Sequence, residues 1–356
     1  MLRGTAGAVA FTFVPSHVLG RAGAQSANEK LNIAAIGIGG MAASNINACS
    51  SENIVALCDV DDAYAAKVFN KFPNARKYKD FRVMLDKEDK NIDAVIVATP
   101  DHTHAVAAMA CIRRNKHIYC QKPLAHSIYE VRKLTEAARE HKVQTQMGNQ
   151  GHSSEEIRML YEWIADGAIG PVHEVYAWSD RPVGGDPWSD FPIMARPKET
   201  PEVPKTLDWD LWLGPVQYRP YHPIYCPMQW RGWWDFGTGA LGDMGTIMHG
   251  SHGAGGVRIV PGATMKAYKR PEKTIPRVPR GSAGHEQDWV RACKDGKPAS
   301  STFDYGGPLT EMVLLGVLAM RLKDTPLEWD PVNLKITNHD EANKYVNPPY
   351  RQGWSL

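Results

Sequence analysis

Short apolar runs alternate with longer amphipathic stretches through the first half of the chain. The runs, which are rich in β-branched and aliphatic residues, predict strands at 31–36, 54–58, 94–98, 117–120 and 143–147. The stretches between them predict helices at 41–49, 63–72, 103–114 and 127–141. The run at 94–98 has no polar alternation, which is typical of a central strand covered by helices on both faces. The pattern therefore predicts βαβ units in a parallel sheet.

The second half of the chain follows a different pattern. A helix is predicted at 154–166, ended by Gly167, and an alternating strand follows at 172–178. Residues 180–230 are dense in Pro, Trp and Tyr without sustained periodicity, so they predict a long ordered loop. Regular helices resume at 285–293 and 309–322. We therefore expect one domain over 30–150 and a second over 151–356.

The N-terminus resembles most of a secretory leader. Residues 5–19 are apolar and small, and Ala22-Gly23-Ala24 offers an A-x-A cleavage site. We expect residues 1–29 to be this leader, the mature chain to begin near Gln25, and the protein to be periplasmic or otherwise exported. The alternative is a disordered or surface-docked arm on a cytoplasmic protein. No run is long enough to span a bilayer after leader removal.

The composition of the chain narrows the classes of molecule that it is expected to bind. The 356 residues are 43% hydrophobic, enough for two ordinary domains. Lys and Arg number 41 against 39 Asp and Glu, without blocks of like charge, so the chain lacks the basic field that holds nucleic acid. The six cysteines are scattered and are expected to be packed thiols. A small-molecule substrate is expected.

A glycine-rich turn follows the first predicted strand. Gly37-Ile38-Gly39-Gly40-Met41-Ala42 is a G-x-G-x-x-A form of the dinucleotide fingerprint, whose glycines let backbone amides approach a pyrophosphate. Asp59 ends the second strand, where a carboxylate accepts ribose hydroxyls and repels a ribose phosphate, so NAD is favoured over NADP. The alternative is a packing turn beside a chance Asp. The expected cofactor contacts here are Gly37, Gly39, Gly40, Met41, Asp59 and Val60.

Two polar motifs leave later strands at their carboxyl ends, the edge where open α/β sheets bind ligands. They are Ala98-Thr99-Pro100-Asp101-His102-Thr103-His104 and Cys120-Gln121-Lys122-Pro123. At this point the chain resembles the Gfo/Idh/MocA family (glucose-fructose oxidoreductase, inositol dehydrogenase and relatives), which carries Glu-Lys-Pro at the second place. Gln in place of Glu is similar to a subgroup of exported bacterial proteins. Further similar strings lie at 147–152, 208–215 and 230–239.

The resemblance implies an α/β protein with an N-terminal Rossmann fold, a doubly wound parallel sheet, and a C-terminal α+β domain. It places Lys122 between nicotinamide and substrate, where a lysine can exchange a proton with a sugar hydroxyl. It also implies NAD contacts from Thr99, Pro100, His104, Gln121, Lys122 and Asn149. Substrate contacts are expected from His152, Arg231, Trp233 and Trp234, although both tryptophan rings could instead be packed. No metal is expected, since no ligand cluster accompanies His102 and His104.

The family's other catalytic pair is an Asp followed four residues later by a His on one helix face. Asp243 matches the Asp, whereas Ile247 stands at the His position and cannot transfer a proton. In similar chains several antiparallel strands follow this point. The mainly antiparallel sheet of the second domain is therefore expected to be shortened near 246–256.

Three functions remain open at this stage. The first is an NAD-dependent dehydrogenase acting on a hydroxyl of a sugar, glycoside or cyclitol, with Lys122 and Asp243 managing the proton. The second is a glycosidase that oxidises, eliminates and re-reduces with bound NAD. The third is a catalytically inactive NAD-binding remnant. In similar proteins the open face of this sheet commonly forms the subunit contact, so the shortened domain is expected either to form a homo-oligomer through a different surface or to remain loosely packed.

Overall fold

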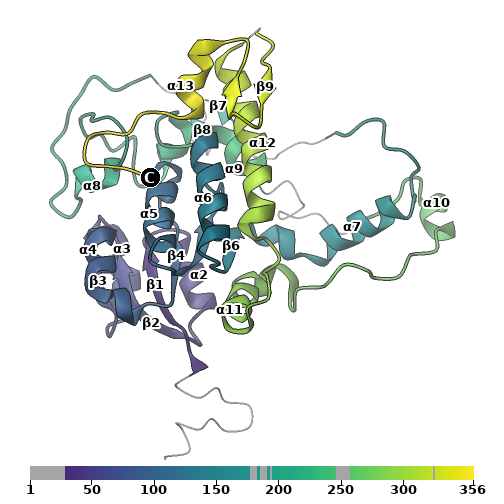
Figure 1. Cartoon of the computed structure of the whole chain (residues 1–356), viewed down its shortest axis with the longest axis horizontal. Helices are drawn as coiled ribbons and strands as arrows, with labels where there is room; N and C mark the ends of the chain where they lie inside the picture. Colours follow the sequence, from purple (N-terminus) through teal and green to yellow (C-terminus); the bar gives the residue numbers. More distant parts are fainter. Residues whose placement is uncertain (1–28, 177–182, 185–190, 193–194, 246–256, 324) are drawn as a thin grey trace, which may run out of the picture.

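The computed structural model describes residues 29–176, 183–184, 191–192, 195–245, 257–323 and 325–356. Its centre is a six-stranded sheet in the order β3-β2-β1-β4-β5-β6, in which every pairing is parallel (Figure 1). The strands are β1 (Asn32–Ile36), β2 (Asn53–Cys58), β3 (Arg76–Tyr78), β4 (Ala94–Val97), β5 (His117–Gln121) and β6 (Thr145–Gly148). The parallel sheet confirms the predicted Rossmann fold.

Five helices connect these strands: α2 (Ala42–Ala48), α3 (Asp62–Lys71), α4 (Phe81–Glu88), α5 (Asp101–Ile112) and α6 (Ile128–Glu140). Helices α3 and α6 begin at capping side chains. Asp61 accepts hydrogen bonds from the backbone of Ala63 and Tyr64, and Ser127 forms a reciprocal capping box with Glu130. Strand β3 and helix α4 were not predicted, because β3 is a three-residue polar run without a hydrophobic period.

The two faces of the sheet bury alternate residues of each strand. On β1, Ala34 and Ile36 face one hydrophobic core while Ile33 and Ala35 face the other. Helices from the end of the chain complete both cores: Trp289 of α11 (His285–Asp295) is fully buried in the second, and Phe303 of α12 (Phe303–Arg321) in the first. The first domain therefore depends on residues far beyond position 150.

The remaining elements are short. They are α7 (Glu155–Ala165), β7 (Val183–Gly184), β8 (Phe191–Pro192), α8 (Trp209–Leu213), α9 (Gly239–Gly245), α10 (Gly262–Ala267), β9 (Trp329–Asp330), β10 (Lys335–Ile336) and α13 (Asn343–Val346), with 3-10 turns at Asp89–Asn91, Gln150–Ser153, Gln229–Gly232, Gly281–Gly284 and Asp340–Ala342. Strands β9 and β10 pair antiparallel, and β7 and β8 pair parallel. A small antiparallel sheet is thus present in the C-terminal region. Helices α7 and α10 project away from the Rossmann body (Figure 1).

The strand predicted at 172–178 is wrong over the residues that the structure describes. Residues 172–176 form no strand, and Val175 and Tyr176 are 79% and 78% exposed. An alternating strand needs a neighbour that pairs with its backbone and covers its apolar face, and the described residues supply none here.

The segment 257–280 should be the first site of tryptic cleavage. Lys266 and Lys269 are exposed on a short helix and the coil after it, and Tyr268 holds this stretch to α7 through ring contact with Trp163 and a 2.8 Å hydrogen bond to Asp166. Few buried contacts favour local opening, which a protease requires. Mass spectrometry of early fragments should show cuts after these lysines before any within 31–149. Earlier cleavage at Lys87, which is also exposed but lies within α4, would contradict this expectation.

Several predictions fall on other parts of the chain. The leader lies outside the described residues except for position 29, and so do Ile247 and the expected truncation at 246–256, so these stay predictions.

All six cysteines are free thiols, as expected. Among the described residues, no helix is both long and apolar enough to cross a membrane.

Candidate functional site

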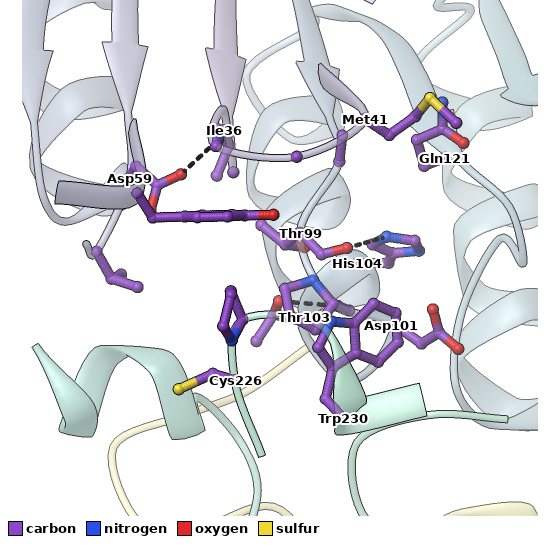
Figure 2. A pocket seen from close by; sticks show the side chains of 18 of the residues that line it. Ile36, Met41, Asp59, Thr99, Asp101, Thr103, His104, Gln121, Cys226 and Trp230 are labelled. Atoms are coloured by element: carbon purple, nitrogen blue, oxygen red, sulfur yellow. Dashed lines mark hydrogen bonds between the residues drawn. The ribbon is translucent and has the colours of Figure 1, made fainter. Parts of the chain in front are cut away.

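One cavity of about 970 Å³ lies along the carboxyl edge of the parallel sheet (Figure 2). It begins at the glycine turn and Asp59, passes the ends of β4 and β5, and reaches Lys122 and Asp243. Most of the expected cofactor contacts line it: Gly37, Gly39, Gly40, Met41, Asp59, Val60, Thr99, Pro100, His104, Gln121 and Lys122. The structure thus brings these residues together around a single space.

The glycines of the turn are required by close contacts. Gly37 has a φ of +78°, and a Cβ there would lie 2.7 Å from the backbone nitrogen of Thr99. A Cβ on Gly39 would lie 2.1 Å from Cδ1 of Tyr64. Only glycine therefore fits at these two positions, which is what the tight turn of a dinucleotide site requires.

Asp59 lies at the end of β2 and is 7% exposed. Its carboxylate accepts 3.0 Å hydrogen bonds from the backbone N–H groups of Gly39 and Asp61. Burial raises the pKa of Asp59 to about 6, although these backbone N–H bonds favour the charged form. At neutral pH the chain thus holds a carboxylate at the place expected for the adenosine ribose.

His104 ties together the loops after β4 and β5. Its Nε2 lies 2.8 Å from the carbonyl oxygen of Thr99 (Figure 2). Its Nδ1 lies 2.8 Å from the carbonyl oxygen of Pro123. Burial lowers the pKa of His104 to about 4, so the ring is neutral at pH 7. The neutral ring carries one N–H, so it donates to only one of these two carbonyl oxygens while it lies between the loops after β4 and β5.

His102 also contacts carbonyl oxygens, those of Trp212 at 2.9 Å and Phe236 at 3.3 Å. The rings of His102 and His104 are both buried, and burial lowers the pKa of His102 to about 3. The described residues contain no group of three or more His, Cys, Asp or Glu side chains that could hold a metal ion.

Lys122 and Asp243 form an ion pair at the inner end of the cavity. The Nζ of Lys122 lies 2.5 Å from Oδ1 of Asp243 and 2.8 Å from its carbonyl oxygen. Both side chains are mostly buried, and Nε of Arg231 lies 3.8 Å from the same Oδ1. The two residues expected to manage the substrate proton therefore meet, although one lies in each half of the chain.

Asp101 is a cavity residue that the sequence prediction missed. It is 3% exposed, and its carboxylate accepts hydrogen bonds from the backbone N–H (3.2 Å) and hydroxyl (2.9 Å) of Thr238. Burial, and then the negative charge of Asp243, raise the pKa of Asp101 to about 7. The signal was present in the sequence, since Asp101 belongs to the motif after β4, but no role was assigned to it there.

Some expected site residues lie elsewhere. Asn149 is 1% exposed, outside the cavity lining, and its side-chain amide has no hydrogen-bond partner in the described part of the chain. His152 stacks on Tyr305 and contacts the carbonyl oxygen of Ser300 at 3.0 Å. Neither side chain lines the large cavity.

The two tryptophans expected to stack on sugar are also placed away from this cavity. Trp233 is 9% exposed and packs edge-on against Tyr225 in an aromatic cluster. Trp234 lies under the guanidinium of Arg321 beside a smaller cavity of about 380 Å³. The packed alternative therefore holds for Trp233. Trp230 lines the larger cavity together with Tyr64, Met228 and Gln150.

Two family models match the chain. One, described as an oxidoreductase family with an NAD-binding Rossmann fold, matches residues 31–149. The other, described as the C-terminal alpha/beta domain of that oxidoreductase family, matches residues 183–252. Fold and site thus define an oxidoreductase-type Rossmann protein. The chain belongs to the Gfo/Idh/MocA family.

The chain is similar to several proteins over part of its length. It is 28% identical to the myo-inositol 2-dehydrogenase of Thermotoga maritima over 41% of this chain and 43% of that protein. It is 36% identical to inositol 2-dehydrogenase 2 of Saccharopolyspora erythraea over 30% of this chain and 32% of that protein. An oxidoreductase domain protein from Kribbella flavida is 24% identical, with 62% of this chain and 52% of that chain covered and a TM-score of 0.44. The chain spans less than half the length of these two curated relatives.

Proposed function

We propose that this chain binds NAD in the large cavity and oxidises a hydroxyl-bearing carbon of a sugar or cyclitol. The observation that carries the proposal is the continuity of the cavity, which joins the carboxylate of Asp59 to the Lys122–Asp243 pair. A dinucleotide needs a ribose acceptor at one end and a reaction site at the other, and the cavity provides both.

The residues present fit NAD. A side chain at Gly37 or Gly39 would clash with Thr99 or Tyr64, so the glycines allow the tight turn that a pyrophosphate site uses, and Asp59 can accept bonds from the adenosine ribose. When bound, NAD supplies the hydride acceptor. Gln121 and His104 line the cavity between the glycine turn and Lys122, where they can support the second half of the cofactor.

The chain's own chemistry concerns the hydroxyl proton. A substrate hydroxyl that hydrogen-bonds with Nζ of Lys122 also comes within reach of the Asp243 carboxylate, because these atoms lie 2.5 Å apart. Asp101 lines the same cavity and has a pKa near neutrality, so it can hold a proton where Ile247 cannot. Arg231 contributes a fixed positive charge beside the pair.

Relatives support the substrate class. Inositol 2-dehydrogenases and a levoglucosan dehydrogenase are among the similar proteins. A solved scyllo-inositol dehydrogenase contains NAD(H) and scyllo-inositol. These compounds carry several hydroxyl groups, which suits a cavity lined by Lys122, Asp243 and Arg231.

A second candidate is the inactive NAD-binding remnant, which Ile247 at the expected His position favours. Purified full-length protein separates the two. We expect calorimetry to show NAD binding, and absorbance of reduced cofactor to rise with at least one member of a panel of cyclitols and sugars. NAD binding without turnover across the panel would indicate the remnant, and no NAD binding would overturn the proposal.

A further inference from the structure

A buried chain of hydrogen bonds runs from the cavity to helix α11. The side-chain Nε2 of Gln121 donates to Oδ1 of Asn45 at 2.9 Å, and Nδ2 of Asn45 donates to Oε1 of Glu286 at 2.7 Å. The three residues are 6%, 0% and 6% exposed. Gln121 belongs to the cavity wall, whereas Asn45 and Glu286 lie behind it.

The direction of these bonds is set by Glu286. An ionised carboxylate can only accept, so Asn45 must turn its NH₂ group towards Glu286 and its oxygen towards Gln121. Gln121 must then donate its own NH₂ group to Asn45. The oxygen Oε1 of Gln121 is left to accept from a ligand, since within the described residues no group donates to it.

Two further observations fix the arrangement. Tyr119 and Gln150 also donate to Oε1 of Glu286, each at 3.2 Å, and no described residue forms an ion pair with this carboxylate. A Cβ on Gly148 would lie 2.7 Å from Cδ of Gln121, so the amide packs directly on the backbone of β6. The side chain of Gln121 therefore has little freedom to choose another orientation.

We propose that Glu286 is a positioning residue that acts through Asn45 to make Gln121 a hydrogen-bond acceptor for a hydroxyl of the bound cofactor. The inference rests on the proposed NAD site. It explains how a neutral glutamine at position 121 can serve as an acceptor: the carboxylate that sets the polarity lies two hydrogen bonds away, at position 286.

A double-mutant cycle tests the polarity of this chain, that is, the direction in which its hydrogen bonds run. Gln121→Glu alone places carboxylates on both sides of Asn45, so its oxygen must face one of them, and we expect NAD affinity to fall about tenfold or more. Adding Glu286→Gln lets the chain of bonds run in the opposite direction, from residue 286 to residue 121. The double variant should therefore recover to within about threefold of the unchanged protein.

Calorimetry with NAD and thermal unfolding should be measured for all four proteins. Glu130→Gln is the matched control, because Glu130 is 3% exposed and accepts a 2.6 Å bond from Tyr350 but does not line the large cavity. It should not rescue Gln121→Glu. Additive losses in the Glu286 cycle would overturn the inference, as would unchanged NAD affinity in Gln121→Glu. If the unchanged protein fails to bind NAD, the proposed function fails, while recovery of Tm in the double variant still supports the polarity.

Discussion

Lys122→Met should lower turnover severely while leaving the fold and NAD binding nearly intact. Removing the ammonium deletes the group that lies 2.5 Å from Asp243 and lines the reaction end of the cavity. A positioned acid or base contributes about 10² to 10⁴ in rate, so kcat/KM for an active sugar or cyclitol should fall by about that factor. Steady-state kinetics, with NAD affinity from calorimetry, checks the prediction.

Lys116→Met is the matched control for this variant. Lys116 has a similarly small exposed fraction and pairs with Asp89, but it does not line the cavity. Its variant should retain wild-type rates. Unimpaired turnover in Lys122→Met would remove Lys122 from the mechanism, whereas equal losses in both variants would point to a general effect on folding.

The Rossmann unit could be predicted from the sequence because its pattern is local. Apolar runs of the right length, such as 94–98, become central strands since both of their faces are buried. The capping residues of α3 and α6 mark helix starts in the sequence itself. Strand β3 was not predicted, because an edge strand of three residues buries too few side chains to impose a hydrophobic pattern.

The structure of the second half could not be predicted, because its residues contact parts of the chain that are far away in sequence. Trp289 and Phe303 complete the cores of the first domain, and no periodicity in their own segments shows which surface they cover. The alternation at 172–178 predicted a strand, but a strand also needs a partner, and the described residues 172–176 have none. Local propensity cannot supply that information.

The candidate site likewise contains residues that the sequence could predict and residues that it could not. Asp59 follows from the spacing after the glycine turn, and the structure places it against Gly39. The pairing of Lys122 with Asp243 depended on the family resemblance, since 121 positions separate them. The buried carboxyls Asp101 and Glu286 were missed, because their importance comes from burial and from partners that only the fold reveals.

Asp59→Asn should weaken NAD binding and remove most of the preference for NAD over NADP. The carboxylate lies in the cavity, and hydrogen bonds to a charged group are worth about 1.5–3 kcal/mol, so NAD affinity should fall about 10- to 100-fold. NADP binding should change less, because the variant also loses the repulsion between a carboxylate and the ribose phosphate. Asp80→Asn is the control, since Asp80 caps α4 but does not line the cavity.

The same residue gives NAD binding a pH dependence whose sign is fixed. Because burial raises the pKa of Asp59 to about 6, the acceptor carboxylate is lost as pH falls through that value, and NAD affinity should decline about tenfold per pH unit below it.

The contribution of Asp59 to the stability of the fold has the opposite pH dependence. The folded state binds this proton more tightly than the unfolded state, so the free energy of unfolding, relative to Asp59→Asn, should rise as pH falls from about 6 towards 3.8, the ordinary pKa of an aspartate. Calorimetry and denaturant unfolding between about pH 5 and pH 8 measure both trends. Asp59→Asn should show a nearly flat NAD affinity over this range, and a wild-type affinity that does not decline on acidification would show that Asp59 does not contact the cofactor.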